Sequence, residues 1–275
     1  MDFGLPASEL AWLLVLMVFG GLATGILAGL LGIGGGGILV PILYEIFSAI
    51  GVSEEILMHM CIGTTLAIII PTSIRSFLSH KAKGAADMEI IRSMAAPVVF
   101  GVAIGATIAR FSNTEILTAI WAGAAGAMSL KMFFGRESWK LGDDIPGNPW
   151  RALYGGFIGM ISTLMSIGGG AFVTMMMTLY GRTIHQAVGT SSGFGPMIAI
   201  PGTIGFIWAG WGVAGTPPFS LGYVSLLSAF IIVPVSVLVA PLGVRLSHGI
   251  SRRKLELAFA IFLALISIRF LWTLF

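Results

Sequence analysis

Apolar runs of membrane-spanning length follow one another from end to end of this 275-residue chain. Each run is close to the ~20 residues that an α-helix needs to cross the hydrocarbon core of a bilayer. Only 10% of the residues are charged, against about 25% in soluble domains, so too few charges exist to cover a water-facing surface. The runs are continuous and lack the alternation of membrane β-strands. The sequence therefore predicts an all-α polytopic membrane protein.

Two of the apolar segments are unusually short, and each directly follows a cluster of glycines. The ten expected segments lie at about Leu10–Leu31, Ile38–Ile50, His59–Leu78, Met88–Arg110, Thr114–Phe134, Trp150–Met165, Ala171–Tyr180, His185–Trp208, Phe219–Val244 and Lys254–Phe275. The second and seventh are too short to span a bilayer comfortably. Because glycine is among the poorest helix formers, the clusters predict glycine-broken helices or helical hairpins.

The two glycine clusters belong to an internal repeat. The stretch "GLLGIGGGG" at 29–37 matches "TLMSIGGGA" at 163–171, which places Gly34 and Gly168 134 positions apart. The stretch "HMCIGTT" at 59–65 likewise matches "HQAVGTS" at 185–191. A polar, proline-containing linker separates the matching parts. The chain is thus expected to comprise a first transmembrane repeat (1–134), a cytoplasmic linker (135–151) and a second transmembrane repeat (152–275).

Basic residues fall in alternate loops, which predicts the orientation of the two repeats. They gather near Lys81, in the linker, at Arg182 and around Arg252, and the positive-inside tendency assigns these loops to the cytoplasm. Both termini are then outside. Each half has an odd number of crossings, either five segments or three spans plus a re-entrant hairpin, so the repeats are expected to have inverted topology. Inverted repeats with discontinuous helices are typical of secondary transporters, whose site lies near the midplane.

The glycine clusters are expected to meet inside the membrane, where broken helices line a cavity. Helices that restart after the clusters present free N–H groups and a positive dipole end, which together can bind an anion. Matching hydroxyls can donate further hydrogen bonds. The predicted substrate-binding residues are Gly34, Gly35, Gly36, Gly37, Gly168, Gly169, Gly170, Thr64, Thr65, Thr190, Ser191 and Ser192. Arg75, His59 and His185 are candidates for the anion path or for proton coupling.

Simpler roles and other functions stay open beside this hypothesis. Transmembrane glycines often permit close helix packing, and Ser or Thr hydroxyls often bond to backbone. Arg75 can extend to the membrane surface, and a histidine at a helix edge is often interfacial. The alternatives are a carrier of another small solute coupled to Na⁺ or H⁺, a passive channel, and an intramembrane hydrolase. The hydrolase would pair His185 with Ser191 or Ser192, but His185 and Ser192 are two helical turns apart.

The same motifs resemble those of the TauE/SafE family of sulfite and organosulfonate exporters. The likeness rests on "GLLGIGGGGILVP" with its second copy "STLMSIGGGAFVT", on the paired "GTT" and "GTSSG", and on "APLGVRL" near the end. One departure is Ser166, where the first copy has Gly32. The resemblance implies a multi-pass carrier of the bacterial inner membrane that exports small sulfur oxyanions such as sulfite or sulfoacetate.

The expected partners are a small anionic solute and the lipid bilayer, with no nucleic acid and with a homodimer left open. The net charge of +3 reflects basic residues in loops rather than a nucleic-acid surface. No enzymatic activity, cofactor or metal is expected.

Overall fold

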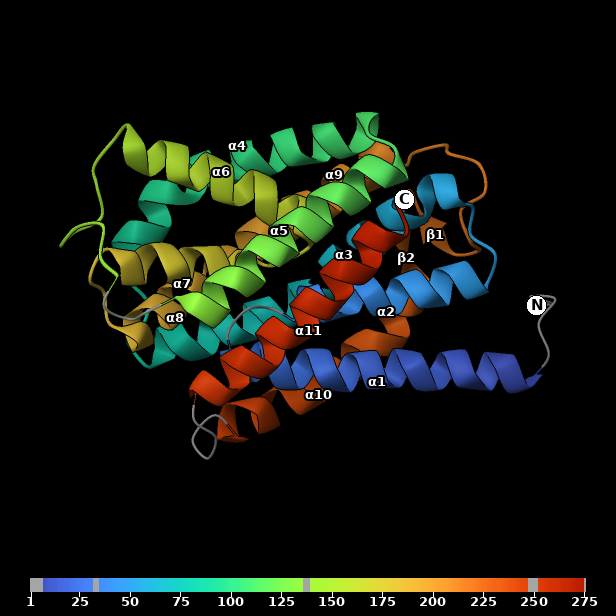
Figure 1. Ribbon diagram of the computed structural model, residues 1–275, viewed down its shortest axis with the longest axis horizontal. Helices are drawn as coiled ribbons and strands as arrows, with labels where there is room; N and C mark the ends of the chain where they lie inside the picture. Colours follow the sequence, from blue (N-terminus) through green and yellow to red (C-terminus); the bar gives the residue numbers. More distant parts are fainter. Residues whose placement is uncertain (1–6, 32–34, 136–138, 247–251, 275) are drawn as a thin grey trace.

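The computed structural model describes residues 7–31, 35–135, 139–246 and 252–274, and these are overwhelmingly helical (Figure 1). The first half contains α1 (Ala7–Leu31), α2 (Gly36–Ala49), α3 (Glu54–Ala82), α4 (Met88–Phe111) and α5 (Thr114–Phe134). The second half contains α6 (Trp150–Met165), α7 (Gly170–Leu179), α8 (Ile184–Ser192), α9 (Phe194–Ala209), β1 (Ser220–Leu221), β2 (Val224–Ser225), α10 (Leu226–Leu246) and α11 (Arg252–Trp272). The expected all-α polytopic architecture is confirmed.

Within these ranges, six helical stretches are long and apolar enough to cross a membrane. They are Ala11–Gly29, Glu54–Ala82, Met88–Phe111, Thr114–Phe134, Ile184–Ala209 and Leu226–Gly243. The helices α2 and α7 are apolar but short, as the sequence predicts. The most enclosed span is α3, which packs against α2, α9 and α10.

The helices run roughly along the long axis of the molecule (Figure 1). The beginning of α1 and the end of α11 lie at one end of the molecule, together with the β1–β2 hairpin. The end of α5 and the start of α6 lie at the opposite end, as do the connections from α3 to α4 and from α7 to α8. We call this the linker end. Its loops carry Lys83 and Arg182, so the charge pattern predicts that it faces the cytoplasm.

Two expected segments differ from the structure in their detail. The segment predicted at 185–208 is divided at Gly193 into α8 and α9. Pro196 explains this division, because a proline cannot donate to the carbonyl four residues earlier, here that of Ser192. The segment predicted from Phe219 begins instead with the β1–β2 hairpin, whose turn contains Gly222 at φ 56°. Glycine adopts this left-handed conformation without a steric penalty.

Two pairs of helices cross closely through glycines, and the two crossings correspond. Where α1 packs on α10, a Cβ on Gly25 would lie 2.4 Å from the carbonyl oxygen of Ser236. Where α6 packs on α4, a Cβ on Gly159 would lie 2.2 Å from the carbonyl oxygen of Val98. Gly25 and Gly159 are 134 positions apart, and Val98 and Ser236 are 138 apart. Each crossing therefore joins a helix of one half to a helix of the other.

The α4–α6 crossing predicts that Gly159→Ala is destabilising, because the new methyl group would collide with main chain that cannot rotate away. We expect a loss of about 1–3 kcal/mol, seen as a lower apparent melting temperature of the purified protein in detergent. Gly123→Ala is the matched control, since no atom lies within 4 Å of a Cβ there. Replacing this helical glycine should stabilise by up to about 1 kcal/mol. Equal melting temperatures for the two variants would contradict this account of the crossing.

Candidate functional site

Both described glycine turns end in a glycine with left-handed backbone conformation. Gly35 has φ 68° and precedes α2, and Gly169 has φ 71° and precedes α7. Neither residue supplies a side-chain cap to its helix. The first N–H groups of α2 and α7 thus receive no side-chain acceptor from the cap residue, which leaves them suited to an anion. Gly34 lies outside the described residues, so its predicted role in substrate binding stays a prediction.

The two turns are in direct contact in the protein interior. A Cβ on Gly36 would lie 1.7 Å from the carbonyl oxygen of Ser166, so only glycine allows this approach. Ser166 itself has φ 53°, and its hydroxyl donates to the carbonyl of Ile62 in α3 at 2.6 Å. Trp121 Nε1 of α5 donates to the carbonyl of Met165 at 3.2 Å. The second turn is therefore held between α3, α5 and the start of α2.

Three buried hydroxyls close to these turns have no hydrogen-bond partner within the described residues. They belong to Thr24 of α1, Thr65 of α3 and Ser162 of α6. The main chain of Thr24 lies against Gly35, and a Cβ on Gly36 would lie 3.3 Å from the Thr65 methyl group. Buried polar groups normally have a partner, because leaving one unpaired costs free energy. The three hydroxyls therefore mark where a polar ligand would be stabilised.

Thr24 and Ser162 are not among the residues that the sequence predicted. Both lie in the helix that precedes a glycine cluster, and Ser162 immediately precedes the repeated stretch 163–171. A hydroxyl residue in an otherwise apolar run before each cluster was the available signal. In the folded chain Ser162 lies beside Gly169 and Thr24 lies beside Gly35. These contacts depend on how the chain reverses after each helix, which the sequence does not show.

The paired Gly-Thr motifs hold the opposite half of the chain. The Thr64 hydroxyl accepts from the N–H of Ser225 at 2.9 Å, and the Thr190 hydroxyl accepts from the N–H of Asp87 at 2.9 Å. Ser225 immediately precedes α10, and Asp87 immediately precedes α4. The adjacent glycines, 63 and 189, each lie against a backbone carbonyl two residues before that N–H. Both threonines thus fasten the start of a long helix from the other half.

The remaining predicted hydroxyls face the same interior. Ser191 accepts from Thr174 of α7 at 3.0 Å and donates to the carbonyl of Val188, while Ser192 donates to the carbonyl of Gly189. Ser192 also lines a small cavity of about 10 Å³ with Thr72, Ser73, Ser76, Ala28, Gly168 and Gly195. This volume is about enough for one water molecule.

The predicted histidines and Arg75 lie apart from the glycine turns. His59 is buried, and its Nε2 donates to the carbonyls of Ala109 (2.9 Å) and Ser112 (3.1 Å), which ties α3 to the end of α4. Its ring packs at 4.7 Å on that of Tyr223, whose pKa is raised by burial. His185 is exposed, and Arg75 is exposed and donates to the carbonyl of Val237 in α10 at 3.4 Å.

The chemistry of this interior is that of uncharged donors. Apart from His59 and the aromatic groups of Trp121 and Tyr223, the buried polar side chains in the described ranges are Ser or Thr hydroxyls. Those ranges hold no group of three His, Cys, Asp or Glu residues that could bind a metal ion. A site built from main-chain N–H groups and hydroxyls can stabilise an oxyanion without burying a countercharge.

The sequence of the chain matches a known protein family over nearly its whole length. The family model described as "Sulfite exporter TauE/SafE" matches residues 17–270. The chain belongs to the TauE/SafE family. The family resemblance of the glycine motifs is thereby confirmed. The expectation of a multi-pass membrane protein is confirmed as well.

Curated relatives of this TauE/SafE protein are named as transporters. A "Probable membrane transporter protein" of Haemophilus influenzae is 33% identical over 94% of this chain and 97% of its own length. A probable membrane transporter protein of Methanocaldococcus jannaschii is 28% identical over 90% and 92%, and one of Bacillus subtilis is 26% identical over 72% and 80%. No solved structure matches. These names favour a transporter over the hydrolase alternative.

The contrast between neighbouring threonines yields a prediction for the stability of this TauE/SafE protein. Thr64→Val removes the acceptor of the buried Ser225 N–H and should cost about 1–3 kcal/mol, because that donor is left unpaired. Thr65→Val removes a hydroxyl that has no partner and should leave the stability equal or higher. Melting curves in detergent compare the two variants. If Thr65→Val lowered the stability as much as Thr64→Val, the Thr65 hydroxyl would have to form a hydrogen bond in the folded protein.

Proposed function

We propose that this TauE/SafE protein is a secondary transporter that exports a small sulfur oxyanion, such as sulfite or an organosulfonate like sulfoacetate. The observation that carries the proposal is the meeting of two glycine-capped helix starts beside unpartnered buried hydroxyls. The family description, which names a sulfite exporter, supports a sulfur oxyanion as the substrate and the outward direction. The interior supports an anion because the unpartnered hydroxyls of Thr24, Thr65 and Ser162 can each donate a hydrogen bond to an oxyanion oxygen.

The binding site in this proposal lies where the turns at Gly35–Gly37 and Gly168–Gly170 come together. Main-chain N–H groups at the starts of α2 and α7 point their positive dipole ends at the substrate, and Thr24, Thr65 and Ser162 donate hydrogen bonds to its oxygens. A buried arginine would hold an anion more tightly, but a carrier also has to release its substrate. Neutral donors satisfy both requirements.

Alternating access arises from inverted repeats in this proposal, and the interhelical contacts support that symmetry. The α1–α10 crossing corresponds to the α6–α4 crossing, and the Thr64–Ser225 hydrogen bond corresponds to the Thr190–Asp87 bond. Each of these contacts joins a helix of one half to a helix of the other half. The equivalent residues of the two halves form the same contact with the halves exchanged. The moving bodies are therefore mixed, with α1 and α10 in one and α4 and α6 in the other, and the glycine turns lie at their junction.

Replacing the three unpartnered hydroxyls tests this function with little risk to the fold. Thr24→Val, Thr65→Val and Ser162→Ala should each lower sulfite efflux from loaded proteoliposomes by about tenfold or more, since each removes a hydrogen bond to a charged substrate. Thr107→Val is the control, because that threonine is on the exposed face of α4 and bonds only to the carbonyl of Ala103.

The substrate and the site are tested separately in this experiment. Wild-type protein that moves neither sulfite nor sulfoacetate would exclude the proposed substrate class. Wild-type efflux that persists unchanged in all three variants would show that the anion passes elsewhere.

A further inference from the structure

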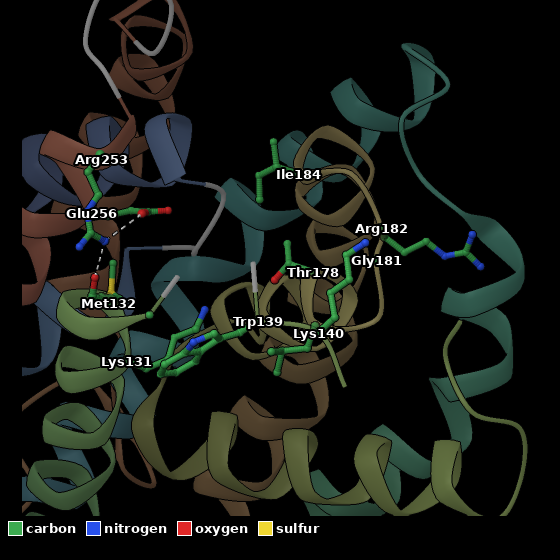
Figure 2. Close-up of a pocket in the computed structure, with 12 residues that line it drawn as sticks. Lys131, Met132, Trp139, Lys140, Thr178, Gly181, Arg182, Ile184, Arg253 and Glu256 are labelled. Atoms are coloured by element: carbon green, nitrogen blue, oxygen red, sulfur yellow. Dashed lines mark hydrogen bonds and ion pairs between the residues drawn. The ribbon is translucent and has the colours of Figure 1, made fainter. Parts of the chain in front are cut away.

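A pocket of about 300 Å³ opens at the linker end of the molecule, and it shares no lining residue with the small cavity beside Ser192 (Figure 2). One wall is the end of α5 with the start of α11, and the opposite wall is the end of α7 with the turn into α8. Trp139 and Lys140 close one side. Elements from both halves of the chain therefore contribute to it.

The lining of the pocket is strongly basic. It contains four cations, Lys131, Lys140, Arg182 and Arg253, and one carboxylate, Glu256. Arg253 donates hydrogen bonds of 2.7 Å to the carbonyls of Met132 and Phe133 and lies 4.0 Å from the Glu256 carboxylate, whereas the Arg182 guanidinium points outward and pairs with Asp144. A surface with this excess of positive charge concentrates anions from solution.

The pocket also has an apolar part, which bears on the kind of anion it would hold. Trp139, Met132 and Ile184 line it together with the cations (Figure 2). Its volume is at the lower limit of pockets for small organic ligands, about 300–1,000 Å³. An oxyanion that carries a short carbon chain, such as a sulfonate, matches this combination of charge, apolar wall and size.

The helix α7 connects this pocket to the glycine turns. Thr178 lines the pocket, and Thr174 and Gly170 follow at intervals of four residues on the same face, ending at the turn itself. Ten helical residues cover about 15 Å, or roughly half of the hydrocarbon core. The Thr174 hydroxyl meets that of Ser191 along this face.

The corresponding place at the opposite end of the molecule is closed. The offsets of the two halves relate Lys131 to Arg269, Met132 to Phe270, Thr178 to Tyr44 and Leu179 to Glu45. At that end Arg269 forms an ion pair with Glu45, and the rings of Tyr44 and Phe270 lie 5.0 Å apart. Residues of α2 and α11 are therefore in contact at one end of the molecule, whereas the equivalent residues of α7 and α5 line the pocket at the other end.

We propose that the basic pocket is the loading site at which an organosulfonate first binds from the cytoplasm before it moves along α7 to the glycine turns. The role in loading rests on the proposed transport function, whereas the binding of the anion does not. In this conformation the pocket is open while Arg269 and Glu45 form an ion pair at the opposite end.

Tryptophan fluorescence of the purified full-length protein in detergent tests the site, with sulfoacetate as the probe and sodium chloride at equal ionic strength as the blank. Sulfoacetate should change the emission of wild-type protein, and Trp139→Phe should remove that change. Lys140→Gln should raise the midpoint about two- to fivefold, as expected for one exposed charge. The matched control is Lys254→Gln, which removes an exposed charge near the same mouth from a residue outside the lining, and it should leave the midpoint unchanged.

Several results would overturn the proposal. One is a sulfoacetate response that neither Trp139→Phe nor Lys140→Gln alters. Another is a response to short-chain phosphatidylglycerol but not to sulfoacetate, which would make the pocket a lipid headgroup site. Normal efflux from proteoliposomes without a Trp139-dependent signal would remove the loading site and leave the transport function intact. Binding without any transport of sulfite or sulfoacetate would leave an anion site but remove its loading role.

Discussion

The contact between Gly36 and the Ser166 carbonyl is the constraint on which the rest of the interior depends. A chain that stops being helical inside a bilayer exposes N–H and C=O groups that lipid cannot satisfy. Here each interrupted segment is placed against the other, so that protein rather than lipid surrounds both. The absence of a side chain at Gly36 is what allows two main chains to come this close. Any polar space that the carrier needs is then bounded by backbone instead of by charged side chains.

The Gly-Thr motifs show how two halves of one chain can be held together without ion pairs in the membrane. Each motif supplies a gap at glycine, which admits a carbonyl, and a hydroxyl at threonine, which accepts the following N–H. These bonds satisfy backbone groups at the start of α4 and α10 that have no partner inside their own helices. Membrane helices lack a hydrophobic driving force for association, so close packing and such hydrogen bonds carry more of the specificity.

Much of the fold could be predicted from the sequence because apolar length and glycine clusters are local signals. Helix α2 begins at Gly36, two residues before the expected apolar segment, and α7 begins at Gly170, one residue before, since a glycine in left-handed conformation ends each turn. The equivalence of Thr64 and Thr190 was readable from the repeat, but their acceptor roles were not, because their partners are more than 100 residues away. The assignment of these residues to substrate binding stays a prediction.

Other features could not be predicted from a linear pattern. The interruption between α8 and α9 has a local cause in Pro196, and this proline is visible in the sequence. By contrast, the importance of Thr24 and Ser162 depends on their having no partner, which is a property of the packed molecule. The basic pocket likewise combines residues from α5, α7, α11 and the linker region, and no single stretch of sequence indicates that they meet.

The crossing of α1 with α10 has a consequence for biosynthesis. Helix α1 is among the first segments to enter the membrane, yet the surface that Gly21 and Gly25 shape for α10 is complete only after nearly the whole chain has been made. At ~5–20 residues per second the interval between these helices is roughly 10–40 s. During that time the nascent glycine face has to be shielded by lipid or by the insertion machinery. A polypeptide that terminated in the linker would leave α1 and α4 permanently without their neighbours, and it would be a natural substrate for membrane proteases.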